Sequence, residues 1–311
     1  MTDLFMQRTL RELFVDRDRQ LQAFSRMADG LASRRIMIVT AGPGMGKSWL
    51  LRMFAEEARN RELPVVYIDF ADGVAYEVIT LVRRFRDAFG AEHFNALTEA
   101  INEATTARVE LVTNGSNPAP RVDVNVAESS VSGSSIAVSE VGTIIKDNNF
   151  VLETDNPIIR QAIEDRITIA FFECLIVLSE KKRVVFLFDT YERNSLDAHS
   201  WSPNTADRWI YNQLLIRMRD GRLPNVIAVL AGRRMRDFGI EWNEVLGRMS
   251  LDPLECDDVK EYLRERRGLS QITEAEGDRL CQAVAGNPQV LGLIGDNLEQ
   301  ANQPQVADDE W

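Results

Sequence analysis

The sequence RIMIVTAGPGMGKSWL, residues 35–50, carries the strongest structural signal in the chain. Its first part, Arg35–Thr40, is a short apolar run of the buried-strand type. A glycine-rich turn follows, and a helical pattern of apolar residues begins at Trp49. Within the turn, four residues have the spacing of a phosphate-binding loop, with Ala in place of the first Gly: Ala41, Gly46, Lys47 and Ser48.

The physical chemistry of this turn predicts a nucleoside triphosphate. Glycines allow the backbone to curl so that successive N–H groups point at anionic oxygens. The start of the following helix faces the same oxygens, Lys47 reaches the β- and γ-phosphates, and the Ser48 hydroxyl is a ligand for Mg²⁺. We therefore expect ATP or ADP with Mg²⁺, and the preference for ATP over GTP stays open. The predicted nucleotide contacts are Gly42, Pro43, Gly44, Met45, Gly46, Lys47, Ser48 and Trp49.

A second apolar run ends in acidic residues, in the sequence VVFLFDTYE. Asp189 at the end of this strand is predicted to hold Mg²⁺ through water, together with Ser48. Glu192 is placed to orient or deprotonate the attacking water. Each has an ordinary alternative, because an Asp at a strand end is often a turn or capping residue and Glu192 could be a surface carboxylate. Asp69, at the end of another predicted strand, is a competing candidate.

The composition limits the classes of partner. The chain has 311 residues, with 36 Lys plus Arg against 48 Asp plus Glu, a net charge of −12. Such an acidic chain is a poor candidate for nucleic-acid or anionic-membrane binding, because phosphate neutralisation needs clustered cations. We find no run of about 18 apolar residues and no signal peptide, so no membrane contact is expected and the cytoplasm is the predicted compartment.

The three cysteines, Cys174, Cys256 and Cys281, are few and widely spaced. Their number and spacing suggest neither a disulfide framework nor a zinc site. The predicted metal ligands are therefore limited to Ser48 and Asp189.

Strand patterns alternate with helical patterns along most of the chain. This order predicts an α/β fold of the P-loop NTPase type, with a parallel sheet covered by helices. Beyond the first strand, the expected strands are 64–70, 183–188, 225–230 and a short one at 249–251. After residue 257 only helical patterns remain, which predicts a small helical lid. Residues 3–14 are also expected to form a helix.

Composition changes between residues 109 and 150, which are rich in Val, Ser, Asn and Gly. Weak period-two alternation predicts a β-hairpin or a flexible loop inserted in the main domain. The predicted map is therefore a nucleotide-binding domain over 1–108 and 151–253, an insertion over 109–150 and a lid over 254–311.

Four further segments make the chain resemble the signal-transduction ATPases with numerous domains, the STAND class of AAA-related P-loop ATPases that includes the NACHT and NB-ARC groups. They are FVDRDRQL from Phe14, AGR from Ala231, LDPLECDDVKEYL from Leu251 and GNPQVL from Gly286. The resemblance implies that Arg17 lies near the adenine, that Arg233 senses the γ-phosphate and that Pro288 packs on the base. Asp16 and Asp18 replace the family's usual Gly and Glu.

The resemblance implies a slow ATPase that acts as a nucleotide-controlled signalling switch governing self-association or partner binding. Thr190 stands where many relatives carry a second acid, so we expect slow hydrolysis. The chain ends after the lid, which suggests a fragment or a minimal member whose protein partners act through domains outside it. Two alternatives stay open: an ATPase that handles DNA, of the origin-recognition or transposition-helper type, and a nucleotide-binding module with negligible turnover.

Overall fold

In the computed structural model, the described residues are 12–74, 76–105, 107–109, 122–124, 142–146, 149–153 and 157–301. The helix expected over residues 3–14 lies mostly outside this range. Among the described residues, no helix is both long enough and apolar enough to cross a membrane.

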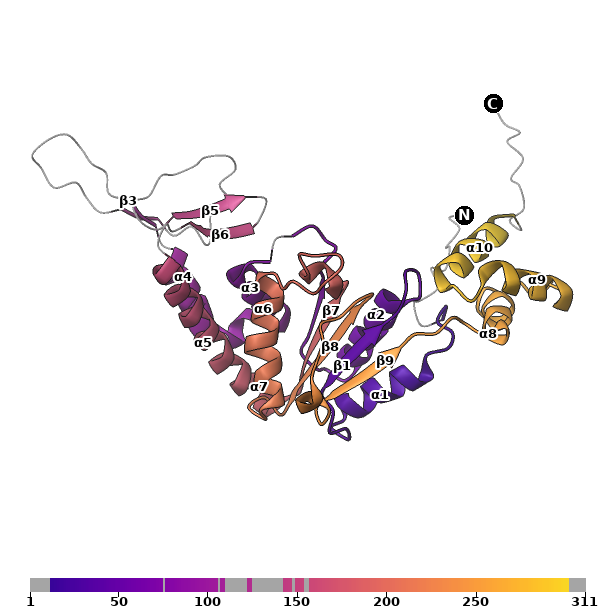
Figure 1. The fold of residues 1–311 in the computed structure, drawn as a ribbon, viewed down its shortest axis with the longest axis horizontal. Helices are drawn as coiled ribbons and strands as arrows, with labels where there is room; N and C mark the ends of the chain where they lie inside the picture. Colours follow the sequence, from indigo (N-terminus) through magenta and orange to yellow (C-terminus); the bar gives the residue numbers. More distant parts are fainter. Residues whose placement is uncertain are drawn as a thin grey trace, which may run out of the picture. The chain divides into compact units, whose positions relative to one another are not determined.

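The central feature is a five-stranded parallel sheet with the strand order β2-β7-β8-β1-β9 (Figure 1). Its strands in chain order are β1 Ile36–Thr40, β2 Val65–Asp69, β7 Val184–Asp189, β8 Val226–Gly232 and β9 Leu246–Ser250. Every residue of β7 and β8 is buried, including Asp189 at the end of β7, as their otherwise apolar sequences predict. With the phosphate-loop sequence between β1 and the next helix, this confirms the predicted α/β P-loop NTPase fold.

The fifth strand is the one that the sequence indicated least clearly. The prediction placed it at residues 249–251, whereas β9 starts earlier and pairs in parallel with β1 from Ile36 opposite Leu246 to Thr40 opposite Ser250. Strand β9 lies at an edge of the sheet, and after Leu246 partly buried and exposed residues alternate along it. Gly247 and Arg248 interrupt its apolar pattern, and this weakened the sequence signal.

The predicted helices are present with shifts of a few residues at their ends. Their bounds are α1 Asp18–Ala28, α2 Lys47–Asn60, α3 Val78–Phe89, α4 Asn95–Thr105, α5 Pro157–Lys181, α6 Thr205–Trp209, α7 Ile216–Arg219, α8 Cys256–Glu261, α9 Glu274–Val284 and α10 Pro288–Ala301. A π-helical segment, Ile210–Leu215, joins α6 to α7, and another, Tyr262–Arg266, continues α8.

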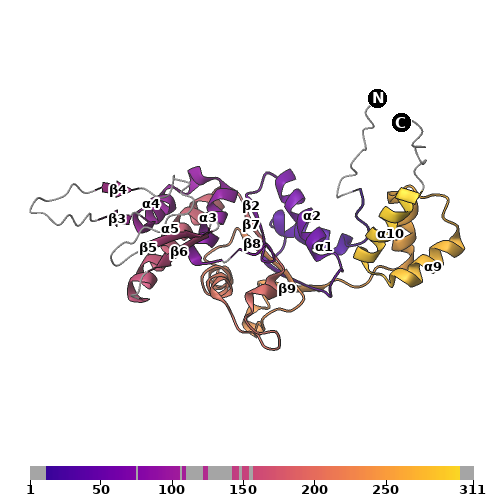
Figure 2. The ribbon, with the colours of Figure 1, turned by 90° about the horizontal axis from the view of Figure 1, so that it is seen from above.

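The described chain packs as two compact units. The first comprises residues up to Asn60, Leu187–Glu192 and the chain from Val229 onward, and the second comprises Arg61–Phe186 and Arg193–Ala228. The first unit therefore contains the phosphate-loop sequence, the ends of β7 and β8, and the helices that were predicted to form a lid. Figure 2 shows α9 and α10 of this unit beside each other.

The second unit has an aromatic core. Phe85 and Phe186 meet edge to face with their ring centroids 5.0 Å apart. Trp209 packs on Phe172, and its indole N–H donates to the Thr168 hydroxyl at 3.0 Å. This bond satisfies the one polar atom that a buried indole carries.

The segment predicted as an insertion contains two antiparallel strand pairs. β3 (Ala107–Val109) pairs with β4 (Val122–Val124), and β5 (Gly142–Lys146) pairs with β6 (Asn149–Glu153). Most other residues of 109–150 lie outside the described range. The helices on either side, α4 and α5, pack against each other.

The C-terminal helices α8 to α10, which were predicted to form a lid and are called the lid below, contain a disulfide that the cysteine spacing did not predict. Cys256 at the start of α8 is bonded to Cys281 in α9, with a Cα–Cα distance of 5.4 Å. The expectation of no disulfide was wrong because the helices bring together residues that are 25 positions apart in sequence. Cys174 is a free thiol and is partly buried.

Candidate functional site

The phosphate-loop sequence adopts a positive-φ backbone at two of its glycines. Gly44 and Gly46 have φ angles of 74° and 83°, which L-residues with a side chain rarely adopt. Helix α2 starts directly afterwards at Lys47, and the N–H of Leu50 donates to the Gly46 carbonyl at 2.9 Å. The N-terminal amides of α2 and its positive dipole end therefore adjoin the loop.

Lys47 folds back over its own loop. Its ammonium donates to the carbonyl oxygens of Ala41, at 2.9 Å, and Gly42, at 2.7 Å. Burial lowers the pKa of Lys47, while the nearby carboxylates of Glu192 and Asp189 act in the opposite direction. Lys47 thus contributes a positive charge to a site that also holds two acidic groups.

Asp189 is the last residue of β7 and its side chain is almost completely buried, at 1% exposure. One carboxylate oxygen accepts the N–H of Thr190 at 2.8 Å. Thr190 has a positive φ of 51°, so the chain turns sharply at the end of the strand. Asp189 therefore has the turn-forming contact that an Asp at a strand end often makes.

Glu192 lies three residues after Asp189, within the short 3₁₀ helix Tyr191–Asn194. Its side chain lies against the end of β8. Its carboxylate accepts the backbone N–H of Arg233 at 3.0 Å, and the Arg233 Nε is 3.6 Å from the other oxygen. A Cβ atom on Gly232 would lie only 2.7 Å from this carboxylate, so the approach requires glycine. Glu192 is therefore fixed in place rather than a freely solvated side chain.

The competing candidate Asp69 makes a local contact. Its carboxylate accepts the N–H of Ala71, two residues later, at 3.0 Å. This is the turn-forming role typical of an Asp at a strand end.

The sequence GNPQ forms the turn that joins α9 to α10. Gly286 has a φ of 67°, and a Cβ there would lie 2.5 Å from the Leu254 carbonyl. Asn287 caps α10 by accepting the N–H of Gln289 at 3.0 Å, and Pro288 occupies the first helical position, where its missing N–H costs nothing. Local geometry therefore accounts for Gly286, Asn287 and Pro288 in this turn.

The same turn also contacts the phosphate loop. The N–H of Gln289 donates to the Gly44 carbonyl at 3.1 Å. A Cβ on Gly44 would lie 2.7 Å from the Asn287 side chain, and one on Gly46 would lie 3.9 Å from the Pro288 ring. Pro288 thus lies beside the phosphate loop.

Arg17 links the N-terminal segment to the chain that leads into the lid. It precedes α1 with a φ of 83°, and its side chain is 6% exposed. The guanidinium donates to the Asp252 carbonyl at 2.8 Å and pairs with Asp16. The resemblance to the STAND class singled out this residue, and the structure shows a buried cation at a chain crossing.

A cavity of about 500 Å³ lies within the first unit and brings the predicted residues together. It is lined by all of the predicted site residues except Gly42: Arg17, Pro43, Gly44, Met45, Gly46, Lys47, Ser48, Trp49, Asp189, Glu192, Arg233 and Pro288. Gly42 adjoins the cavity, since its carbonyl oxygen accepts a hydrogen bond from the Lys47 ammonium. All three stretches of chain that make up the first unit therefore contribute to the walls of one site. The role of each residue stays a prediction.

Other lining residues were missed from sequence. Arg267 donates to the Tyr262 hydroxyl at 2.8 Å and pairs with Asp296 at 2.7 Å and with Glu299 at 3.0 Å. Tyr262, Arg267 and Asp296 all line the cavity, as do Arg52, Leu254 and Gln289. Burial raises the pKa of Tyr262, so its hydroxyl stays protonated in the neutral range. No local pattern marks Tyr262, Arg267 and Asp296 as a group, since only the packing of the segment 262–267 against α10 brings them together.

The donor chemistry fits a hard divalent cation. Ser48 and Asp189 both line the cavity and offer oxygen atoms, the ligands that Mg²⁺ prefers. In the described part of the chain there is no cluster of three His, Cys, Asp or Glu residues suited to a metal. A cation here would thus take its remaining ligands from phosphate and water, the usual arrangement for Mg²⁺ beside nucleotides.

No protein-family model and no curated protein matches the chain in sequence. Among solved structures, it is similar to a signal transduction ATPase with numerous domains that carries a tetratricopeptide repeat sensor, from Pyrococcus horikoshii. The identity is 11% and the TM-score 0.45, over 91% of this chain but only 30% of that protein.

The chain is also similar to the ORC2 protein of Aeropyrum pernix, solved in ADPNP–ADP complexes. The identity is 13% and the TM-score 0.41, over 95% of this chain and 72% of that one. Neither likeness assigns an activity to this chain.

Proposed function

We propose that this chain binds ATP with Mg²⁺ in the cavity of the first unit and acts as a nucleotide-controlled switch with slow ATPase activity. One observation carries the proposal. A glycine-rich loop that opens a helix, a buried strand-end carboxylate and a helical lid line the same cavity, which has the volume of a typical ligand pocket.

The triphosphate would lie along the loop. The amides of residues 43–48 and the start of α2 offer donors to its oxygens. Lys47 would exchange its two carbonyl partners for phosphate oxygens, a charge-assisted contact that is stronger than the ones it makes here. The loop therefore accounts for affinity that ATP and ADP share.

Ser48 and Asp189 would hold Mg²⁺, which neutralises phosphate charge when bound. Asp189 suits this role because it is a carboxylate held in place at the end of β7, where one of its oxygens accepts the N–H of Thr190. Thr190 offers no second carboxylate at this point, which is consistent with slow turnover.

Glu192 and Arg233 would act at the γ-phosphate end. Glu192 can orient a water molecule or accept a proton from it, because the Arg233 amide fixes its carboxylate. The Arg233 side chain is 61% exposed and lies at the same wall, so its guanidinium can reach the developing negative charge.

A switch function follows from the contact between loop and lid. The turn at Asn287 to Gln289 meets the loop at Gly44, so a nucleotide that reshapes the loop also changes the support of α10. A ligand shifts such an equilibrium only through different affinities for its two states. We therefore infer that the lid position reports which nucleotide is bound and controls self-association or partner binding.

Calorimetry on the full chain tests the proposal. ATP, ADP and GTP are titrated with and without Mg²⁺, and the matched control variant is Lys182→Ala, an exposed lysine that pairs with Glu62 in the second unit. We expect the wild type and this control to bind ATP equally. Absence of binding in the wild type would overturn the proposal, and turnover that depends on added duplex DNA would favour the DNA-handling alternative.

A further inference from the structure

The lid holds a reactive group that the proposed nucleotide chemistry does not use, the Cys256–Cys281 disulfide. Cys256 is solvent-exposed, whereas Cys281 is buried in the lid core with 8% exposure. The exposed sulfur can be reached by an external thiol or disulfide, and the buried one is protected from side reactions. This asymmetry suits reversible exchange, which depends on access to one of the two sulfurs.

The facing sides of α8 and α9 explain why the two cysteines meet. Cys256 and Lys260 are four residues apart on one face of α8, and Gly277 and Cys281 have the same spacing on α9. A Cβ atom on Gly277 would lie 3.2 Å from the Lys260 side chain, so the helices approach closely at this point. The interface thus holds the two sulfurs within reach of each other.

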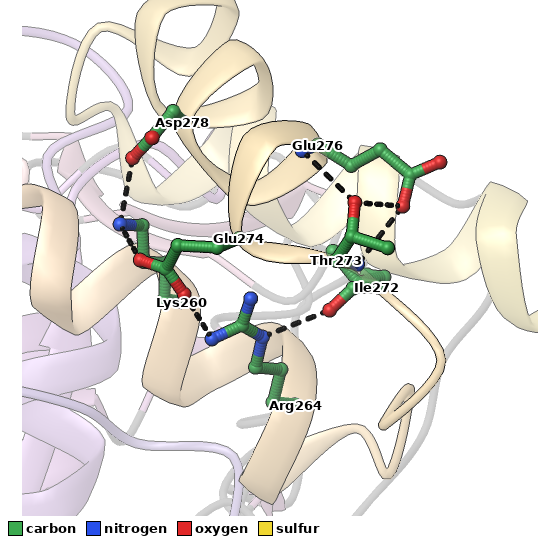
Figure 3. Close-up of polar contacts among 7 residues, drawn as sticks. All are labelled: Lys260, Arg264, Ile272, Thr273, Glu274, Glu276 and Asp278. Atoms are coloured by element: carbon green, nitrogen blue, oxygen red, sulfur yellow. Dashed lines mark hydrogen bonds and ion pairs between the residues drawn. The ribbon is translucent and has the colours of Figure 1, made fainter.

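Besides the disulfide, ion pairs connect α9 to α8 and to the π-helical segment that continues α8 (Figure 3). Lys260 pairs with Glu274 and, at 2.6 Å, with Asp278, while Arg264 pairs with Glu274 at 2.8 Å. Exposed pairs of this kind are individually weak. Because these pairs are weak, we expect reduction of the disulfide to loosen the α8–α9 interface. Because the pairs remain after reduction, we expect the lid to stay folded.

This interface is continuous with the wall of the cavity. The helical run that begins at Cys256 continues through Tyr262, which lines the cavity and belongs to the same buried cluster as Cys281. Tyr262 in turn accepts a hydrogen bond from Arg267, another lining residue. A shift of α8 relative to α9 would therefore move two residues that face the ligand.

We propose that the Cys256–Cys281 pair is a redox switch that sets the nucleotide affinity of the lid, with the disulfide form binding more tightly. The proposal rests on the proposed nucleotide function. The oxidised form keeps the cavity wall in the arrangement described above. The reduced form must fix that wall during binding, and this ordering weakens affinity.

The exchange balances with a disulfide as co-reactant, either a small molecule or a protein. The Cys256 thiolate attacks one sulfur of the co-reactant and expels a thiolate, which leaves a mixed disulfide. The Cys281 thiolate then attacks the Cys256 sulfur and expels the second thiolate. Two cysteine thiols lose two electrons and two protons, and the co-reactant disulfide becomes two thiols; a dithiol reverses the reaction.

The test compares ADP binding to the full chain after treatment with oxidised or reduced dithiothreitol. Thiol labelling of the denatured protein verifies each state, with one of the three cysteines labelled when oxidised and all three when reduced. We expect the dissociation constant for ADP to rise about fivefold on reduction, a coupling typical of linked sites. Melting temperature should fall by about 5 °C with the loss of a disulfide.

Two variants sharpen the result. Cys256→Ser replaces the exposed partner, so it should bind ADP with the weaker affinity of the reduced protein under both conditions. Cys174→Ser removes the free thiol and should keep the full response. Equal ADP affinity of oxidised and reduced wild type would overturn the redox switch alone, as would labelling of all three cysteines after oxidation. Absence of ADP binding in both states would overturn the proposed function as well.

Discussion

The two sides of the cavity differ in how the sequence specifies them. The loop side is built from consecutive residues, and its backbone follows from two glycines with positive φ and the helix that starts at Lys47. The lid side is built from the segment 262–267 and from α10, whose residues only packing brings together, such as Arg267 with Asp296. Local chemistry therefore determines the side expected to hold phosphate, and tertiary packing determines the side left for the rest of the ligand.

This difference suggests that the two sides contribute differently to binding. The loop side carries fixed amides and a lysine, which provide charge-assisted contacts. The lid side carries an ion-paired Arg267 and a protonated Tyr262, and its position depends on a mobile interface in the proposed switch. Substitutions on the loop side should thus have the larger effects.

The largest expected effect is that of Lys47→Ala. It should abolish measurable ATP binding, because loss of a charge-assisted phosphate contact costs about 1.5–3 kcal/mol or more. Calorimetry measures this, with Lys182→Ala as the control. Unchanged ATP affinity in Lys47→Ala would show that the loop does not bind phosphate.

Asp189→Asn should keep nucleotide affinity largely intact and remove Mg²⁺-dependent turnover. The amide keeps the size of the carboxylate and an oxygen for the Thr190 N–H, but it loses the charge that holds the cation. Phosphate release is measured against Mg²⁺ concentration. Equal rates in the wild type and the variant would refute the metal role of Asp189.

Gly232→Ala tests the position of Glu192. The added Cβ would lie 2.7 Å from the Glu192 carboxylate and should displace it from the Arg233 amide. We expect turnover to fall about tenfold, the smaller part of a typical general-base contribution, with ADP affinity unchanged. Gly247→Ala is the control, since a Cβ there would have the Arg34 side chain as its nearest neighbour, at 3.4 Å. A normal rate in Gly232→Ala would show that Glu192 has no part in turnover.

Pro288→Ala tests the lid side with a smaller change. If the turn packs on the base, the variant should weaken ATP and ADP alike by about fivefold, the loss of part of a buried apolar contact. A variant that discriminated only against ATP would place Pro288 near the γ-phosphate. The position of the Pro288 ring beside Gly46 makes this measurement decisive for the orientation of the ligand.

The smallest effect is expected for a change in the segment that was predicted to be an insertion. Replacement of residues 108–146 by a short Gly/Ser linker should leave folding and ATP binding nearly unchanged, because loop-closure entropy changes slowly with length, by about 0.6 kcal/mol per doubling. The flanking helices α4 and α5 pack on each other and are linked by the Glu103–Arg166 ion pair.

Thermal unfolding with and without ATP measures both properties of this deletion. If it lost the ATP-induced stabilisation, the segment would belong to the nucleotide site or its supporting core. If stabilisation is retained, any function of the segment should lie in contact with a partner through its strand edges.

The sequence alone determined the buried central strands and the loop side of the site. The strands β7 and β8 are apolar runs except for Asp189 at the end of β7, and such runs between helices have few alternatives to a buried parallel sheet. The spacing of Gly46, Lys47 and Ser48 predicts a strand, a turn and a helix in that order, and the structure has them. These features were predictable because they depend on residues close together along the chain.

Only the tertiary structure decided the rest. The Cys256–Cys281 disulfide and the Tyr262–Arg267 wall join residues through the packing of helices, which no spacing rule gives. The edge strand β9 was misplaced for the same reason, since its pairing with β1 and not its composition makes it a strand. Long-range contacts depend on how whole elements pack, and a single sequence read segment by segment contains no direct record of that packing.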